Sequence, residues 1–588
     1  MAQSCSKTPW WKGAVIYEIY IRSFYANPAI TSVEQSHEKD GSIGTLLGIV
    51  DKLDYIQTLG VDAIWITPFY KSPMRDFGYD VEDYYEIDQR FGTIEHFKHL
   101  IDEAHKRDLK VVVDQVWGHT SIDHKWFKSE RQNLVSEECD SSWYVWQPSK
   151  PDGMPPNNWF SFFGGSAWTW DSEVDQYYLH HFLDTQPALN LHNPEVTDEL
   201  LRISEFWLDL GVDGFRLDAV PFWMHDPAFT DNQPRAKGEA PADGFSRDLP
   251  SAKQRQTYNV DHENLLRFLT EFRKSVDSRP DAEDRSILLM AEVAAEKSIE
   301  VAAKYSQKDR LHTAYNFALL KICHNANEVV QTVRAALESL ESKEIGADNT
   351  CWCIGNHDVQ RIVSRWGSYA IAANKSDRFA KLVMSLHLSL PGSICIYQGE
   401  ELGLPQAQLN HDQLKDPYDK ALGDKQVGRD GARTVMPWEE EEPYFGFSKE
   451  RPWLDLPNNL QEYTQRTVDG QQENVNSVLH SYRKFLAWRK QNRSTIIHGD
   501  FRLLRSIEEP LLAFSLECDA GEELLFVYNF SLRKSRFLLR NYWYECIPLK
   551  DEDSFLKDLD FVMGSQNQVG SAIILEPLSF YLARIPAV

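Results

Sequence analysis

The chain of 588 residues carries 88 acidic against 62 basic side chains, which gives a formal net charge of -26. This excess of negative charge repels phosphate backbones and anionic lipid surfaces, so we expect neither a nucleic acid nor a membrane partner. With 42% hydrophobic and 12% aromatic residues, the sequence can bury a large core and has the length for more than one domain.

The first residues and the cysteines indicate where the protein works. Residues 1–11 contain no apolar run as long as a secretory signal, and no later segment has the length and apolarity of a membrane span. The closest two of the eight cysteines, Cys351 and Cys353, have one residue between them, unlike a Cys-x-x-Cys redox or zinc pair. We therefore expect a cytoplasmic protein with reduced, mostly buried thiols.

Eight apolar runs rich in β-branched residues alternate with segments of helical period. One such segment places Leu46, Ile49, Leu53 and Ile56 on one face and ends at Gly60. Apolar strands separated by amphipathic helices predict an α/β fold with a parallel sheet, and eight units are the number that closes a (β/α)8 TIM barrel. A doubly wound open sheet is the alternative. The runs span residues 15–24, 63–70, 110–116, 214–220, 287–293, 314–320, 351–355 and 393–398.

Two long segments interrupt this alternation. Residues 119–187, rich in Trp, Pro, Gly and Asn, predict an irregular excursion after the third strand, and residues 221–264 predict a polar insertion after the fourth. In a barrel both rise at the carboxyl ends of the strands, where active sites form. Short alternating runs later in the chain predict an antiparallel β-domain. The expected divisions are a catalytic barrel over 1–118 and 188–496, an inserted B domain over 119–187, and a C-terminal β-domain over 497–588.

Polar side chains follow several of the predicted strands. A single carboxylate at a strand end is more often a helix cap or part of a buried ion pair than a catalytic group. Carboxylates delivered by strands four, five and seven of a closed barrel would instead converge over its mouth, and convergent carboxylates suit the cleavage of glycosidic bonds. The polar groups are Asp114 to His119, Arg216 with Asp218, Glu292, and His357 with Asp358.

These residues stand in motifs that resemble the α-amylase superfamily of glycoside hydrolases, from about Trp10 to the end of the chain. Within it, the sequence resembles the branch of exo-acting α-glucosidases and oligo-glucosidases more than the endo-acting amylases. The general motifs are Asp114-Gln-Val-Trp-Gly-His119, Gly214-Phe-Arg-Leu-Asp218, the Glu292 strand and Asn356-His357-Asp358. Those of the exo-acting branch are Asp76-Phe-Gly-Tyr-Asp80, Gln186-Pro187, Tyr397-Gln-Gly-Glu-Glu401, and Arg429-Asp430 with Arg433-Thr434.

The resemblance implies a retaining mechanism with two carboxylates in opposite roles. Asp218 would attack the anomeric carbon, and Arg216 on the same strand face would keep it ionised by lowering its pKa. Glu292 would first protonate the leaving oxygen and then activate water, which requires a pKa raised by burial or negative neighbours. Retention places the two carboxyl groups roughly 5 to 5.5 Å apart.

The resemblance also implies a pocket that holds one glucose unit. Asp358 would bind the 2- and 3-hydroxyls in hydrogen bonds that strengthen in the transition state. Tyr79 and Phe163 would form aromatic walls against the apolar face of the ring. The remaining implied sugar contacts are those of His119, His357, Asp76 and Arg429.

The residue after the nucleophile bears on the linkage that is cleaved. By the resemblance to this family, relatives that cleave α-1,6 bonds carry valine at this position, whereas α-1,4 enzymes carry alanine or threonine. Ala219 therefore predicts a preference for maltose and other short α-1,4-glucosides, with sucrose as a further candidate. The predicted partner is thus a small α-glucoside, and the sequence leaves open whether the protein is a monomer or a homo-oligomer.

Several positions depart from the family pattern. Many relatives hold calcium in an Asp-rich loop after strand one, but here residues 37–45 carry Thr45 where an aspartate is expected, and Gly118 stands where amylases tend to place a calcium-binding asparagine. The sequence therefore predicts that no cofactor or metal is required. Ala188 and Ala318 also differ from the family pattern, and nothing in the sequence explains them.

Two other functions remain open at this stage. A transferase or isomerase of the trehalose synthase or sucrose isomerase type would use the same glucosyl ester and differ only in acceptor contacts and water exclusion. A non-catalytic, transporter-associated relative would keep the barrel as an interaction scaffold. That second function predicts missing catalytic carboxylates and a membrane helix, and the sequence shows neither.

Overall fold

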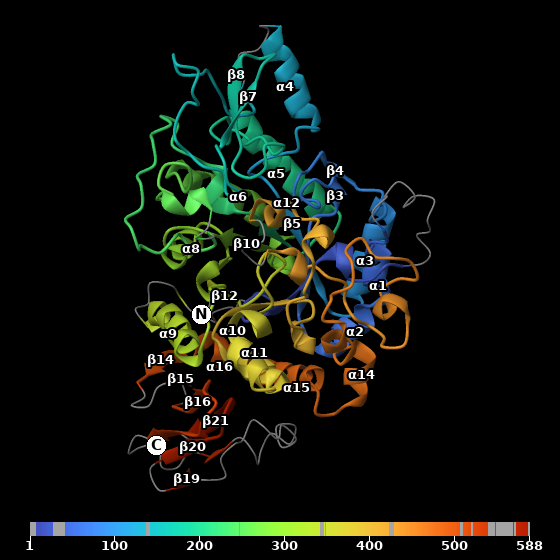
Figure 1. The fold of residues 1–588 in the computed structure, drawn as a ribbon, viewed down its shortest axis with the longest axis vertical. Coiled ribbons are helices and arrows are strands. Elements are labelled where there is room, and N and C mark those ends of the chain that lie inside the picture. The colour runs from blue at the N-terminus through green and yellow to red at the C-terminus, as the bar shows by residue number, and fades with distance from the viewer. Residues whose placement is uncertain are drawn as a thin grey trace, which may run out of the picture.

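A computed structural model gives the fold of the chain (Figure 1). It describes residues 8–27, 41–136, 142–245, 247, 249–341, 346, 349–422, 428–505, 510–518, 521–538, 547–548, 568–569 and 572–585.

Eight parallel strands close into a barrel in the order β1-β13-β12-β11-β10-β9-β5-β2. Each corresponds to one of the eight apolar runs, so the predicted TIM barrel is confirmed and the open sheet is excluded. Their residues are buried on both sides, because side chains fill the barrel and helices cover it. The strands are β1 (Val15–Ile19), β2 (Ala63–Ile66), β5 (Lys110–Gln115), β9 (Gly214–Leu217), β10 (Leu288–Val293), β11 (Thr313–Asn316), β12 (Thr350–Cys353) and β13 (Ser393–Tyr397).

Amphipathic helices surround the barrel. The segment predicted as one helix over Leu46 to Gly60 is two, because the backbone breaks at Lys52 between α1 (Leu46–Asp51) and α2 (Leu53–Leu59). Gly60 ends α2 with a φ of 97°, a left-handed conformation that glycine adopts without strain. The other covering helices are α3 (Ile94–His105), α5 (Pro194–Asp209), α6 (Asn264–Asp277), α7 (Ala282–Arg285), α8 (Ser298–Tyr305), α9 (Ala326–Glu341), α10 (Ile362–Ala372), α11 (Ser376–Ser389), α15 (Val478–Gln491) and α16 (Arg493–His498).

The excursion after β5 is more regular than the sequence predicts. It contains α4 (Lys125–Val135) and a three-stranded sheet in the order β6-β8-β7, at the upper end of Figure 1. The sequence did not predict this sheet, because its strands are too short to show a clear alternation of apolar and polar residues. They are β6 (Trp146–Gln147), β7 (Trp168–Asp171) and β8 (Gln176–Leu179). A hairpin of β3 (Tyr70–Lys71) and β4 (Asp83–Ile87) follows β2.

The insertion after β9 is irregular, as the sequence predicts. Side chains fix it to the loop and helix that follow β10, because the Asp261 carboxylate accepts hydrogen bonds from Lys304 and Tyr305 and Arg235 pairs with Glu296. Its short helices are the 3-10 turns Val220–Trp223 and Pro250–Lys253.

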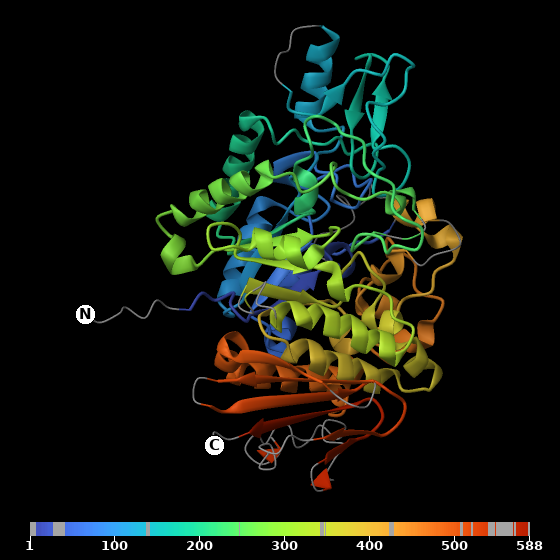
Figure 2. The same ribbon diagram turned by 90° about the vertical axis from the view of Figure 1, so that its left-hand side faces the viewer.

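A long segment after β13 includes α12 (Pro417–Leu422), α13 (Leu460–Thr464) and α14 (Val468–Glu473). The chain then ends in antiparallel sheets on the side of the barrel opposite to β7 and β8 (Figure 2). Among the described residues, no helix is both long and apolar enough to cross a membrane. The terminal sheets comprise β14 (Asp500–Leu504), β15 (Leu511–Glu517), β16 (Glu523–Asn529), β21 (Ser579–Ile585) and β18 (Ile547–Pro548), and β17 (Ser535–Leu538), β20 (Ala572–Leu575) and β19 (Gln568–Val569).

Candidate active site

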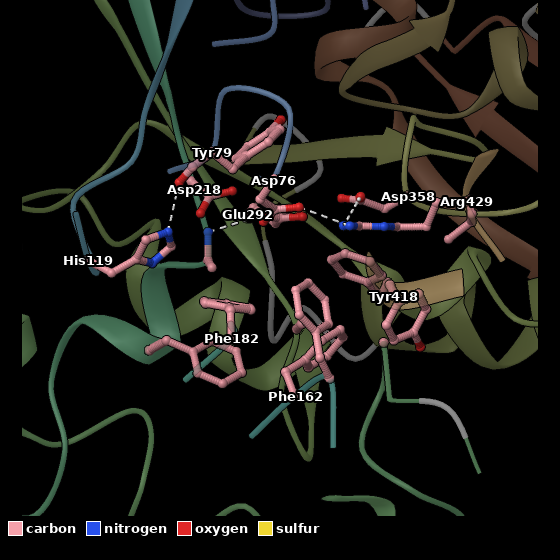
Figure 3. A pocket seen from close by; sticks show the side chains of 17 residues that line it. Asp76, Tyr79, His119, Phe162, Phe182, Asp218, Glu292, Asp358, Tyr418 and Arg429 are labelled. Atoms are coloured by element: carbon pink, nitrogen blue, oxygen red, sulfur yellow. Dashed lines mark hydrogen bonds and ion pairs between the residues drawn. The ribbon is translucent and has the colours of Figure 1, made fainter. Parts of the chain in front are cut away.

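One pocket at the carboxyl ends of the strands collects the three predicted acids (Figure 3). Asp218 directly follows β9, Glu292 lies near the end of β10, and Asp358 follows β12. The pocket encloses about 720 Å³ of unfilled space, counting the solvent at its opening. Its lining residues are Asp76, Tyr79, His119, Phe162, Phe163, Phe182, Asp218, Ala219, Phe222, Gly244, Glu292, Ala294, Phe317, Asp358, Val359, Tyr418 and Arg429.

A single buried guanidinium holds the two acids predicted to act on the anomeric carbon. Arg216 Nη1 lies 2.7 Å from Asp218 Oδ1 and 2.7 Å from Asp114 Oδ1, while Arg216 Nη2 lies 2.5 Å from Glu292 Oε2. We call Arg216, Asp114, Asp218 and Glu292 the Arg216 cluster. Because Asp218 and Glu292 bond to the two terminal nitrogens of one planar group, both carboxylates can reach the same substrate carbon.

Burial controls proton affinity in the Arg216 cluster. It raises the pKa of Glu292 to about 7, against the opposing charge of Arg216, which agrees with the prediction for a proton donor. Burial also raises the pKa of Asp218 to about 7 although Arg216 lowers it. Arg216 thus lowers the pKa of Asp218 as predicted, but burial outweighs this effect, because one guanidinium does not offset the desolvation of three carboxylates.

The backbone after Asp218 adopts a strained conformation that serves Glu292. Ala219 has a φ of 44°, in the left-handed region that residues with a Cβ seldom adopt. In this conformation the Ala219 amide donates to Glu292 Oε2 at 3.0 Å. The Trp223 indole donates to the Asp218 carbonyl at 2.8 Å. The segment thus links the two acids through the main chain as well as through Arg216.

A second guanidinium closes one end of the pocket. Arg429 Nη2 donates to Asp76 Oδ1 at 3.0 Å and Arg429 Nη1 to Asp358 Oδ1 at 3.1 Å, as dashed lines in Figure 3 show. Arg429 also bonds to Asp416 with Nε and Nη2, and Arg433 Nη2 donates to Asp358 Oδ1 at 2.8 Å. We call these five residues the Arg429 cluster. Burial alone would raise the pKa of Asp358, but His357, Arg429 and Arg433 together hold it below its ordinary value.

Aromatic rings line the side of the pocket opposite to the acids, as Figure 3 shows for Phe162, Phe182 and Tyr418. The Arg429 guanidinium lies 5.1 Å from the ring centre of Phe163 and 5.4 Å from that of Tyr418, within the range of cation–π contact. Phe163 was predicted from the family resemblance, whereas its aromatic neighbours in the pocket were not. The Phe162-Phe163 doublet in the inserted segment was the available signal for one of them.

His119 and Tyr79 both line the pocket and are joined by a hydrogen bond. His119 Nε2 lies 2.8 Å from the Tyr79 carbonyl, and the Tyr79 hydroxyl donates to Asp114 Oδ2 at 3.1 Å. The Gln186 amide donates to Asp76 Oδ2 at 2.9 Å, which places Gln186 behind this wall. Burial lowers the pKa of His119 to about 4, so its ring is neutral at neutral pH.

Two predicted site residues do not line the pocket. Arg216 and His357 are both fully buried, with side-chain exposures of 0%. Arg216 lies beneath the two acids, and His357 lies behind Asp358, with its ring stacked on Tyr79 at 5.2 Å. The sugar contact implied for His357 stays a prediction, because a motif shows which residues gather but not which of them line the pocket.

Comparison with known proteins places this pocket in a family. The model of the alpha amylase catalytic domain matches residues 18–499, which contain every residue of the pocket. The chain belongs to the α-amylase family. It is therefore a glycoside hydrolase, as the motifs predicted.

Individual members of the family cover nearly the whole chain. A probable alpha-glucosidase of Rhizobium meliloti (strain 1021) is 43% identical over 529 residues, which are 89% of each sequence. An oligo-1,6-glucosidase of Heyndrickxia coagulans is 34% identical over 557 residues, 89% of this chain and 92% of that protein. The crystal structure of an alpha-glucosyl transfer enzyme, XgtA, has a TM-score of 0.87 at 40% identity, over 98% of this chain and 100% of the other.

The calcium sites expected from the family fit this chain poorly. Thr45 is occupied as a helix cap, because its hydroxyl accepts from the Gly48 amide at the start of α1, and residues 37–40 of the same loop lie outside the described residues. Within the described part of the chain, one acidic group has the spacing of a metal site, and it lies in the segment after β13: Asp416, Asp419 and Asp430. Asp419 and Asp430 accept backbone amides there and Asp416 pairs with Arg429, so we derive no catalytic step through a metal. That none is required stays a prediction.

Proposed function

We propose that the protein is a retaining α-glucosidase that releases glucose from the non-reducing end of short α-1,4-glucosides such as maltose. The observation that carries the proposal is the convergence of Asp218, Glu292 and Asp358 on one pocket that Arg429 closes at one end. An exo-acting enzyme needs such a closed end, because it must stop the chain after one sugar unit.

The Arg216 cluster supplies the chemistry of both steps. In the first step an Asp218 carboxylate oxygen attacks the anomeric carbon, the glycosidic bond breaks, and protonated Glu292 gives its proton to the leaving oxygen. In the second step ionised Glu292 takes a proton from water, which displaces Asp218 and releases glucose. Arg216 bonds to both carboxylates and holds them on the same side of the sugar carbon.

The Arg429 cluster supplies recognition of the bound glucose. Asp358 keeps a low pKa and is ionised at neutral pH, so it accepts hydrogen bonds from sugar hydroxyls. Asp76 and Arg429 occupy the closed end and bind the hydroxyls farthest from the bond that is cleaved. The rings of Tyr79 and Phe163 pack against the apolar face of the sugar.

The pocket favours neutral glucosides over phosphorylated ones. Arg429 is the one cationic side chain among the described residues that line it, and three carboxylates already neutralise it. A phosphate on the sugar would therefore meet no free positive charge. This supports a simple α-glucoside as substrate, although relatives of comparable length include a trehalose-6-phosphate hydrolase of Bacillus subtilis.

Ala219 supports the α-1,4 preference. Its methyl group lines the pocket beside Glu292, where the leaving sugar must fit, and its left-handed backbone disfavours a β-branched side chain. An alanine therefore leaves room that a valine would fill. We expect maltose to be cleaved with a higher kcat/KM than isomaltose.

The test is to incubate the purified protein with maltose, isomaltose, sucrose and starch and to identify every product and its first-formed anomer. The proposal predicts α-glucose from maltose, little attack on starch, and slower cleavage of isomaltose. β-Glucose as the first-formed anomer from sucrose, which releases only one glucose, would refute retention, and oligosaccharides or a rearranged disaccharide as main products would show a transferase or isomerase. We also propose the cytosol as its location, which the free thiols of Cys351 and Cys395, 3.5 Å apart, support.

A further inference from the structure

Glu18 lies in the barrel interior and has no part in the two steps described above. It is on β1, its side chain is fully buried, and its Oε1 lies 2.5 Å from Nδ1 of His357. The His357 amide also donates to this oxygen at 3.4 Å, whereas Glu18 Oε2 has no hydrogen-bond partner. A carboxyl group in such a place needs an explanation, because a buried charge with an unbonded oxygen is strongly destabilising.

The imidazole of His357 connects Glu18 to the pocket. Its ring lies between the rings of Tyr20 and Tyr79, at centroid distances of 5.7 and 5.2 Å. Its second nitrogen, Nε2, lies 3.3 Å from Asp358 Oδ2, on the side of the ring away from Glu18, in a geometry that makes no hydrogen bond. Arg429 and Arg433 hold the other oxygen of Asp358, so His357 is the neighbour that faces Oδ2.

The number of protons on this pair decides whether the contacts attract or repel. If Glu18 were ionised and the ring carried one proton, on Nδ1, then the lone pair of Nε2 would face the Asp358 carboxylate. If the pair carries two protons, one lies between Oε1 and Nδ1 and the other is on Nε2, directed at Asp358. The second arrangement also leaves the unbonded Oε2 as a neutral carbonyl oxygen, which costs less to bury than a carboxylate oxygen.

The electrostatic surroundings favour the arrangement with two protons. Burial raises the pKa of Glu18 well above its ordinary value, Arg216 opposes this, and the negative Asp358 and Asp114 add to it. Burial likewise lowers the pKa of His357 to about 3, so the ring does not bind a further proton from solvent at neutral pH. Both directions fit a neutral pair.

We propose that Glu18 is a positioning residue that makes His357 present an Nε2 proton to Asp358. Glu18 acts through His357 and does not touch the substrate. The Nε2–H dipole attracts Asp358 Oδ2 across 3.3 Å and so orients the carboxylate, while Arg429 and Arg433 hold Oδ1. The kinetic part of this inference rests on the proposed function, since it is read through Asp358 and glucose.

Two substitutions test whether Glu18 acts as a hydrogen-bond donor to His357 or only fills space. Glu18→Gln can still donate to Nδ1 through its amide, whereas Glu18→Leu cannot. We expect Glu18→Gln to keep the parent kcat/KM and Glu18→Leu to lose about tenfold, the equivalent of one hydrogen bond of about 1.4 kcal/mol. The loss should fall mainly on kcat, because the bonds of Asp358 strengthen in the transition state.

Glu400 provides the matched control. It is also buried, at 5% exposure, and both of its oxygens lack hydrogen-bond partners, but its carboxyl group lies beside Gly355 rather than His357. Glu400→Gln and Glu400→Leu should leave the kcat of maltose cleavage unchanged. Equal losses of kcat in Glu18→Leu and Glu400→Leu, or equal losses in Glu18→Gln and Glu18→Leu, would overturn the inference.

A second measurement is independent of activity. In protein labelled with 15N-histidine, the signals of His357, identified by their loss in His357→Gln, report which ring nitrogen carries hydrogen. We expect protonated Nε2 in the parent and in Glu18→Gln, and mixed tautomers in Glu18→Leu. A bare Nε2 in the parent would refute the inference. If the tautomers are as expected but maltose is not cleaved, the proposed function fails and the assignment of Glu18 stands.

Discussion

The two ion clusters of the pocket contain equal numbers of acids but different numbers of arginines. In the Arg216 cluster three carboxylates share one guanidinium, and burial raises the pKa of Asp218 and of Glu292 to about 7. In the Arg429 cluster two guanidiniums serve three carboxylates: the pKa values of Asp358 and Asp416 lie below normal, while burial raises that of Asp76. The second arginine thus keeps Asp358 and Asp416 ionised, whereas Asp218 and Glu292 can exchange protons near neutral pH.

The largest expected effect comes from removing the nucleophile. Asp218→Asn should lower kcat for maltose by about 10⁴-fold or more, because no glucosyl ester can form. The amide also removes the negative charge that raises the pKa of Glu292, so this pKa should fall in the variant. Initial rates measure the first effect, and circular dichroism with a melting curve controls for folding. Cleavage at the parent rate would contradict the assignment of Asp218.

Removing the proton donor should have a smaller effect that depends on the leaving group. Glu292→Gln should slow maltose cleavage by about 10² to 10⁴-fold. With p-nitrophenyl α-glucoside the loss in the first step should be smaller, because nitrophenolate leaves without a proton. Comparing kcat/KM for the two substrates tests this. Equal losses with both substrates would argue that Glu292 serves another purpose.

The raised pKa values predict a narrow pH optimum for the parent enzyme. As pH falls below about 7, Asp218 gains a proton and loses nucleophilicity; as pH rises above it, Glu292 loses the proton that it must donate. Because the two groups are coupled, the limbs of the kcat/KM profile describe the pair rather than either residue. At two pH units from the optimum, kcat/KM should be about 30-fold lower than at the optimum. A flat profile between pH 5 and pH 9 would contradict this cause.

The smallest effect is expected in the Arg429 cluster. Arg429→Lys keeps the charge but cannot bridge Asp76 and Asp358 while also bonding to Asp416, so KM for maltose should rise about tenfold with a smaller change in kcat. Arg451→Lys is the matched control, since Arg451 is exposed and pairs with Asp455 outside the pocket. If Arg429→Lys instead lowered kcat alone, the division between the clusters would be wrong.

The barrel was predictable from sequence because its signal is repeated. Eight buried strands need eight apolar runs, and helices such as α3 show their buried face at regular intervals. The break at Lys52 was not predictable, because α1 and α2 continue one apolar face. The sheet of β6, β7 and β8 was missed because two- and four-residue strands are too short to alternate visibly.

The three catalytic acids were predictable because each lies at or just after the carboxyl end of a barrel strand, within a recognisable motif. Tyr418 and Asp416 were not, because they lie at the start of the short helix α12, outside any recognisable motif, and only the fold brings this segment to Asp358. The net rise in the pKa of Asp218 was not predictable for a related reason. A sequence shows that Arg216 is near but does not show how completely both groups are removed from water.

The bridge that Arg429 makes between Asp76 and Asp358 blocks one end of the pocket. In the proposed mechanism the departing sugar and the incoming water cannot pass this end, so both would use the open part of the pocket, one after the other. How quickly that part empties decides whether the ester next meets water or another sugar.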